Sequence, residues 1–206
     1  VPVASELEAG ANTEKLKLLF HKSSKYTIVL MYPLLVFSFF YVSPIILFWV
    51  GEGFDTSAIL AQMFIISLLF VALSASGAVI MVGLNRVKEL IVYTGTGSLI
   101  NLVVSILLVK KIGVKGVLVG TLIGTVIIAS GYLYRMLKLF DYSLSLFLKD
   151  ILGKPLIGST LLGAGFLILS KNFYLGISLT ILYVIATIPL LIDADDRKEL
   201  LKQFKK

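Results

Sequence analysis

The strongest constraint on this chain is a series of long segments that contain almost no charged side chains. Six such segments lie at roughly 27–49, 57–81, 90–109, 114–134, 153–170 and 174–192. A helix needs about 20 consecutive apolar residues to cross the hydrocarbon core of a bilayer. Charged residues make up only 15% of the 206 residues and hydrophobic residues 58%. These features predict a multi-pass membrane protein and exclude a water-soluble globule, a disordered chain and a secreted disulfide scaffold.

The segments have the pattern of helices rather than of strands. Strands of a transmembrane barrel are about 10 residues long and alternate strictly between apolar and polar residues. Segment 57–81, for example, is longer than that and does not alternate. The sequence therefore predicts an all-α integral membrane protein, a bundle of six transmembrane helices.

Lysine and arginine are distributed unevenly between the two sides that six alternating helices would define. Fifteen of the 19 fall on the side of the N-terminal segment, the loop 82–89, the linker 135–152 with Lys154 at its edge, and the C-terminal tail. Only four fall on the other side, three of them in the cluster 110–115. Cytoplasmic loops carry the excess of basic residues. Both ends of this 206-residue chain are therefore expected in the cytoplasm, and the protein is expected in the plasma (inner) membrane. The bilayer itself then accounts for the net charge of +7, and no nucleic-acid partner is expected.

These observations divide the chain into five parts. They are a cytoplasmic helix end and loop (1–25), four transmembrane helices (27–134), a cytoplasmic amphipathic linker (135–152), two further transmembrane helices (153–192) and a cytoplasmic basic tail (193–206). In the linker, five apolar residues share one helical face, which predicts a helix lying on the membrane surface. They are Phe140, Leu144, Phe147, Leu148 and Ile151. The chain begins without Met or a signal-peptide pattern, and we interpret it as a piece of a longer protein.

The sequence does not contain the residues that several kinds of catalytic or metal-binding site require. The chain contains no cysteine and a single histidine, His21, so thiol catalysis and a histidine-pair metal site are not expected. The middle of each apolar segment lacks acidic and basic side chains, which usually mark ion pathways and charged-substrate sites in membranes. We therefore predict no catalytic residue, no metal site and no cofactor, and we do not expect an enzyme.

A stripe of small polar residues follows the third and fourth segments. Thr94, Ser98, Asn101 and Ser105 fall on one helical face, and Thr121 lies within a row of glycines at 116, 120 and 124. Lipid offers polar groups no partners, so this face should meet protein or water. Two interpretations remain open: the five side chains line a hydrophilic cavity, or they form hydrogen bonds between packed helices. The glycine row itself favours close helix packing.

Two prolines interrupt the first segment. Pro33 and Pro44 are eleven residues apart, which is close to three helical turns and places them on nearly the same face. Each removes a backbone donor, so the helix should bend. A static kink and a moving hinge are both compatible with this pattern.

Several short motifs, in order, resemble a known family. They are Pro2 to Ser5, the acidic and basic loop before the proline-containing helix, Gly51-x-x-Phe54, Gly83 with Arg86-x-Lys88, Asn101 with Ser105, and Gly113-x-x-Gly116 followed by Gly120-Thr121. Over residues 1–135 the chain is similar to Wzx-like polysaccharide flippases of the MATE/MOP superfamily, which export the lipid-linked repeat units of O-antigen and capsule.

The resemblance implies more than this chain contains. Members of the superfamily have two pseudo-symmetric helix bundles around a central cavity and work by alternating access, and this chain would be the C-terminal lobe. The implied partners are a lipid-linked glycan, the N-terminal lobe of the same protein, a glycan polymerase and glycosyltransferases. Cationic residues that meet the pyrophosphate of the cargo would lie in the N-terminal half. The alternatives are a cation-coupled multidrug exporter, a peptidoglycan-precursor flippase of the same superfamily, and a membrane scaffold without transport activity.

Overall fold

The computed structural model describes residues 13–169 and 173–191, and within these ranges every regular element is helical. The elements are α2 (Thr13–Val50), α3 (Asp55–Gly83), α4 (Val87–Ile112), α5 (Val114–Leu139), α6 (Leu144–Phe147), the π-helix η1 (Leu148–Gly153), α7 (Lys154–Leu169) and α8 (Phe173–Leu191). The predicted all-α class is confirmed for this part of the chain. The expected tail 193–206 and the first twelve residues lie outside it.

Four of the helices, α2 to α5, are long and apolar enough to cross a membrane. The other two apolar helices offer shorter stretches, Pro155–Leu167 and Phe173–Thr187. The chain is therefore a multi-pass membrane protein by the length and composition of its helices, while the count of six membrane crossings stays a prediction. The first helix begins at Thr13, well before the expected start at residue 27, so part of the expected N-terminal loop is helical.

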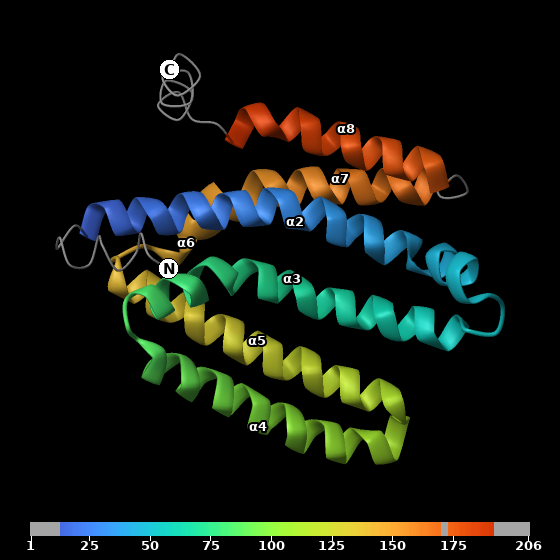
Figure 1. The fold of residues 1–206 in the computed structure, drawn as a ribbon, viewed down its shortest axis with the longest axis horizontal. Helices are drawn as coiled ribbons and strands as arrows, with labels where there is room; N and C mark the ends of the chain where they lie inside the picture. The colour runs from blue at the N-terminus through green and yellow to red at the C-terminus, as the bar shows by residue number, and fades with distance from the viewer. Residues whose placement is uncertain (1–12, 170–172, 192–206) are drawn as a thin grey trace.

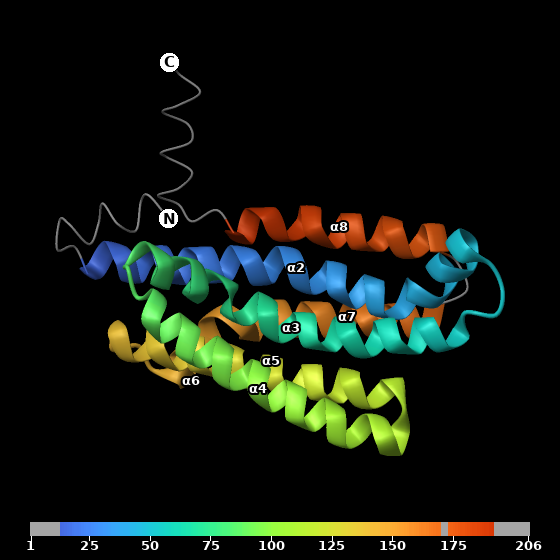
Figure 2. The ribbon, with the colours of Figure 1, turned by 60° about the horizontal axis from the view of Figure 1, so that its bottom comes forward.

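The long helices run up and down and lie side by side in one bundle (Figures 1 and 2). From one edge to the other, α4 packs on α5, α5 on α3 and α3 on α2, while α7 and α8 pack on the far side of α2. Contacts between α4 and the rest of the bundle are few. The start of α2, the α3–α4 loop and the end of α5 gather at one end of the bundle (Figure 1). We call this the basic end, because it carries Arg86, Lys88, Arg135 and Lys138.

The main hydrophobic core lies toward the basic end. Phe20 of α2 is buried there and stacks on Phe147 of α6 with ring centroids 5.6 Å apart. Met136 of α5 is fully buried beside Gly77 of α3, where an added Cβ would lie 2.9 Å from its Cγ. The absence of a side chain at Gly77 therefore lets α3 and α5 approach closely.

A second, aromatic cluster joins the other half of α2 to α7 and α8. Tyr41 of α2 and Phe166 of α7 are buried, and their rings meet edge to face with centroids 5.2 Å apart. Phe173 of α8 packs on Tyr41 with centroids 5.7 Å apart. Edge-to-face aromatic pairs of this kind stabilise a contact beyond the area that they bury.

The linker after α5 differs from its predicted form. Phe140, Phe147 and Ile151 are buried in the main core, whereas Leu144 and Leu148 are exposed. The five residues thus do not share one apolar face on the membrane surface. The segment 148–153 is a π-helix, whose wider turn changes which residues lie above one another. The linker is therefore anchored in the bundle through three of these side chains.

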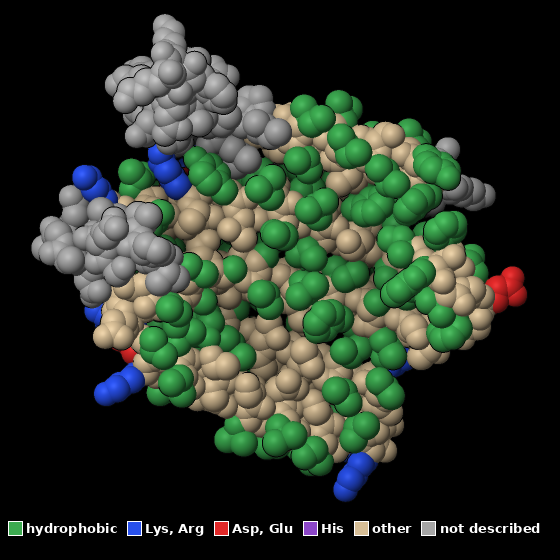
Figure 3. Space-filling model, in the orientation of Figure 1, with side chains coloured by type: hydrophobic (Ala, Val, Ile, Leu, Met, Phe, Trp, Pro, Cys, Tyr) green, Lys and Arg blue, Asp and Glu red, His purple; other side chains and the backbone are tan. Residues whose placement is uncertain are grey.

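The outer surface of the described helices has the character of a lipid-facing surface. In Figure 3, hydrophobic side chains cover the middle of the visible face, and lysine and arginine side chains lie toward its ends. Large apolar side chains such as Leu161 and Leu167 of α7 are each 68% exposed. An exposed apolar belt with charges at both ends is the arrangement that a bilayer stabilises.

Candidate functional site

The predicted polar stripe lies along the contact between α4 and α5, which we call the α4–α5 seam. Glycines bring the two backbones together there: a Cβ added to Gly97 would lie 2.8 Å from the carbonyl oxygen of Gly124, and one added to Gly124 would lie 2.7 Å from the Cβ of Asn101. A Cβ on Gly120 would overlap the hydroxyl of Ser105. The prediction that the glycine row serves close packing therefore agrees with the structure.

Two of the five candidate side chains meet at one backbone carbonyl, and a third is hydrogen-bonded to one of them. The hydroxyl of Ser105 donates a hydrogen bond to Oδ1 of Asn101 at 2.9 Å and also lies 3.3 Å from the carbonyl oxygen of Val117. Thr121 donates to the same carbonyl at 3.0 Å. Asn101, Ser105 and Thr121 are half-buried, so their hydroxyl and amide groups are only partly accessible from outside the seam.

The remaining two candidates lie closer to the basic end. Thr94 donates a hydrogen bond to the carbonyl of Leu90 at 2.8 Å, and its hydroxyl lies 2.5 Å from the hydroxyl of Tyr132 on α5. Ser98 is exposed on α4. Thr94 and Ser105 therefore take part in hydrogen bonds between α4 and α5. A cavity lined by the five side chains stays a prediction. Tyr132 was absent from the predicted set, because an aromatic residue in an apolar run is indistinguishable from a core residue.

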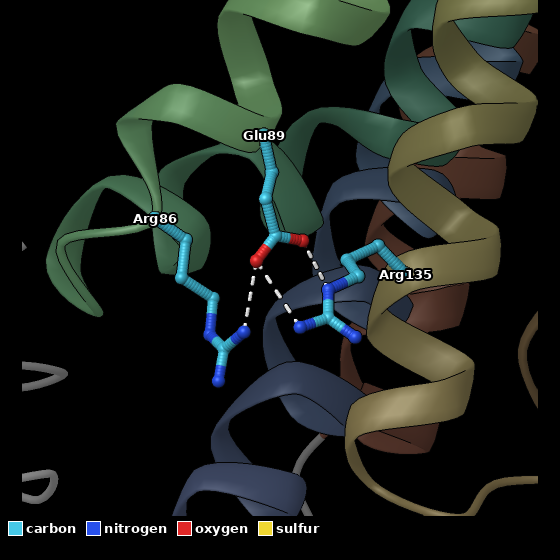
Figure 4. A network of polar contacts seen from close by, with 3 residues as sticks. All are labelled: Arg86, Glu89 and Arg135. Carbon is cyan, nitrogen blue, oxygen red and sulfur yellow. Dashed lines mark hydrogen bonds and ion pairs between the residues drawn. The ribbon is translucent and has the colours of Figure 1, made fainter.

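A charged cluster closes the seam at the basic end (Figure 4). Arg86 from the α3–α4 loop and Arg135 from α5 both point at the carboxylate of Glu89, in the first turn of α4. Nη1 of Arg86 lies 2.9 Å and Nη2 of Arg135 lies 3.1 Å from Oε1 of Glu89, and Nε of Arg135 donates to Oε2. Arg135 thus holds the carboxylate with two parallel hydrogen bonds, the strongest geometry for such a pair.

The sequence places Arg86 in the loop 82–89 and Arg135 in the linker 135–152, and it does not reveal that the two side chains meet. The available signal was Glu89, an acidic residue within three positions of Arg86 at the start of a helix. Two guanidinium groups share one carboxylate, so the cluster keeps a net positive charge. It joins the α3–α4 loop, α4 and α5 at the level where the membrane surface is expected.

Two pockets lie away from the seam. The larger, of about 550 Å³, lies where α5 ends and α6 begins, and we call it the α5–α6 pocket. It is lined by Ser130, Leu133, Tyr134, Leu137, Lys138, Asp141, Tyr142, Ser143 and Leu144. The smaller, of about 240 Å³, lies between α2 and α3 and is wholly apolar. Neither pocket contains any of the five seam candidates.

Tyr142 in the α5–α6 pocket is held in place from α2. Nδ1 of His21 lies 3.0 Å from the Tyr142 hydroxyl, and the ammonium of Lys17 lies 5.6 Å from the centre of its ring. Burial raises the pKa of the Tyr142 hydroxyl, and the negative charge of Asp150 raises it further. The side chain therefore remains a neutral phenol at physiological pH.

The two prolines lie in different surroundings. The helix α2 continues through both, but Pro33 is fully buried while Pro44 is exposed, close to the exposed residues 47–50. Figure 1 shows that the last turns of α2 bend away from its axis. Gln62 of α3 donates a hydrogen bond to the carbonyl of Phe39 at 3.0 Å, next to the carbonyl that Pro44 leaves without its intrahelical donor. A bend at this level agrees with the prediction, and motion about either proline stays a prediction.

Residues 13–169 and 173–191 contain no group of three or more histidine, aspartate or glutamate side chains arranged to hold a metal ion. Comparison of the chain with protein-family models, with curated proteins and with solved structures found no match.

Proposed function

We propose that this chain forms the C-terminal lobe of a plasma-membrane transporter that moves a lipid-linked oligosaccharide across the bilayer by alternating access. The observation that supports this most directly is the polar stripe on α4, a helix at the edge of the bundle that contacts little besides α5. Ser98 is exposed there, and the side chains of Asn101 and Ser105 are half-buried. Hydroxyl and amide groups at the open edge of a membrane bundle need a partner that lipid tails do not offer.

A sugar head group is a chemically suitable partner. It must cross about 30 Å of hydrocarbon, and each of its hydroxyls loses hydrogen bonds to water on the way. Serine, threonine and asparagine side chains both donate and accept hydrogen bonds without adding charge. Such a lining would shelter a neutral glycan while its lipid tail remains in the bilayer.

The packing of α4 against α5 fits a moving lobe. Close glycine contacts along the α4–α5 seam and the cluster of Arg86, Glu89 and Arg135 tie the two helices together. Alternating access in transporters is largely a rigid-body motion of one bundle against the other. The hairpin of α4 and α5 would therefore move as one unit against a second, N-terminal lobe.

The experiment replaces polar residues of the stripe by substitutions in the native gene. Ser98→Leu replaces a hydroxyl with a larger, apolar side chain at an exposed position. Thr121→Val keeps the shape of the side chain while removing its hydroxyl. We expect each variant to reduce the glycan displayed at the cell surface by about fivefold, the effect of a lost hydrogen bond worth about 1 kcal/mol. Surface glycan is measured by labelling intact cells, and the amount of transporter by immunoblotting membranes.

Ser178→Leu on α8 is the matched control. Ser178 is also exposed, and its hydroxyl donates to the carbonyl of Tyr174 in its own helix at 2.9 Å. This variant should leave surface glycan unchanged. Normal glycan in the Ser98 and Thr121 variants would contradict the proposal, as would a loss of drug resistance without a loss of glycan.

A further inference from the structure

The α5–α6 pocket is the largest hollow described above, and the proposed transport does not use it. Its volume of about 550 Å³ is within the range of about 300–1,000 Å³ that is typical of ligand sites. It lies at the basic end of the bundle, where α5 ends and the chain turns toward α6. A pocket at this level would face the head-group region of the adjoining leaflet.

The pocket presents charges of both signs. Lys138 and Asp141 both line it, so its wall carries one cation and one anion. The ammonium of Lys138 also lies 5.9 Å from the centre of the Tyr134 ring. Asp141 has a left-handed backbone conformation with φ of 46°, within the chain turn that leaves the end of α5. A ligand that carries only a negative charge would pair with Lys138. It would leave the carboxylate of Asp141 without a positively charged partner.

Hydroxyl groups and aromatic faces complete the polar part of the wall. Ser130 and Ser143 line the pocket, and the hydroxyl of Ser143 makes no capping hydrogen bond to α6. Tyr134 and Tyr142 contribute rings to the same wall. The faces of aromatic rings attract any cation, and a carboxylate accepts charge-assisted hydrogen bonds from a primary ammonium. A lysine with nearby hydroxyls suits a phosphate.

The remainder of the wall is apolar. Leu133 and Leu137 come from α5 and Leu144 from α6. Leucine side chains beside charged groups, at the end of membrane helices, are suited to the glycerol and acyl part of a lipid. The pocket therefore combines a zwitterionic polar part with an apolar part.

We propose that the α5–α6 pocket binds phosphatidylethanolamine, the phospholipid whose head group carries a phosphate and a primary ammonium. Lys138 receives the phosphate, and Asp141 accepts hydrogen bonds from the ammonium, which lies against Tyr134 and Tyr142. Phosphatidylcholine offers the same charges, but its quaternary ammonium has no hydrogen to donate to Asp141. Phosphatidylglycerol lacks the positive charge altogether.

The experiment measures lipid retention by native mass spectrometry of the purified full-length protein. Synthetic dioleoyl phosphatidylethanolamine, phosphatidylcholine and phosphatidylglycerol are supplied one at a time at equal concentration. We expect phosphatidylethanolamine to be retained about tenfold better than the other two, because only its primary ammonium can donate a charge-assisted hydrogen bond to Asp141. Asp141→Asn should abolish this preference and raise the relative binding of phosphatidylglycerol. Lys138→Gln should lower the retention of all three lipids.

Lys88→Gln and Glu14→Gln form the matched control. Both side chains are exposed at the same end of the bundle and neither lines the pocket, so the preference for phosphatidylethanolamine should persist. Equal retention of the ethanolamine and choline lipids, or a preference for phosphatidylglycerol in the unmodified protein, would overturn the proposal. So would equal losses in the control variants. If glycerophosphoethanolamine, the same head group without tails, competed as well as the intact lipid, the site would belong to a soluble ligand.

Discussion

At the scale of single residues, the α4–α5 seam depends on which glycines face the partner helix. Gly95 and Gly97 are two positions apart on α4, yet a Cβ on Gly95 meets nothing within 4 Å, while one on Gly97 would meet the backbone of α5 at Gly124. Backbone atoms cannot move aside as a flexible side chain can. The same substitution should therefore have opposite effects at the two positions.

Gly97→Ala is expected to destabilise the protein by about 1–3 kcal/mol, the usual cost of overpacking a tight contact. Gly95→Ala should stabilise it by up to about 1 kcal/mol, because alanine is the better helix former. The measurement is thermal or denaturant unfolding of the purified protein in detergent. Equal effects of the two substitutions would contradict the close approach of α4 and α5 at Gly97.

At the scale of elements, α4 and α5 form a hairpin that is fastened at both ends. At one end they are joined through Gly113, whose φ of 66° and ψ of −149° favour glycine. At the other end Glu89 of α4 is held by Arg135 of α5. Glycine contacts lie between these two points. The hairpin is thus the most tightly connected pair of helices among the described elements.

The strength of the charged fastening can be measured with a double-mutant cycle of Glu89→Gln and Arg135→Gln. The side chains of Glu89 and Arg135 are 33% and 23% exposed, so water screens much of their attraction. We expect a coupling free energy of about 0.5–1 kcal/mol at low ionic strength, and a smaller one at high salt. The four unfolding free energies give this value, and additive single effects would show that the pair contributes nothing.

At the scale of the whole molecule, successive long helices run in opposite directions, so the predicted loops lie at two opposite ends of the bundle. The α3–α4 loop with Lys88 lies at the basic end, and the α2–α3 turn with Glu52 lies at the other (Figure 1). The excess of lysine and arginine predicts that the basic end faces the cytoplasm. This orientation decides from which side a cargo would enter.

The orientation can be tested by cysteine labelling, because residues 1–206 contain no cysteine of their own. Glu52→Cys should react with a membrane-impermeant maleimide in intact cells. Lys88→Cys should react only after the membrane is permeabilised. Both side chains are exposed, so poor access is not an explanation for a missing signal. The reverse pattern of labelling would place the basic end outside the cell and overturn the predicted orientation.

Much of the helix content could be predicted from the sequence, because the thickness of the bilayer sets the length of each apolar segment independently of the others. The segment predicted at 57–81 is α3, Asp55–Gly83, with Gly51 and Gly53 at positive φ before it and Asn85 at positive φ after it. Glycine is the residue that most readily adopts such a conformation, so the α2–α3 turn was visible in the sequence. The early start of α2 could not be predicted, because charged residues surround Leu16 and Phe20 in the sequence. In the structure the core buries both side chains.

The sequence by itself determined that the chain is apolar and helical, and that charged side chains are few in its long apolar segments. Only the tertiary structure decided that α4 packs on α5, that Glu89 meets Arg135 across 46 positions, and that the linker inserts Phe147 and Ile151 into the core. The reason is physical. Backbone hydrogen bonds and the thickness of hydrocarbon constrain each segment on its own, whereas pairing depends on the shapes of two distant surfaces, which no single segment encodes.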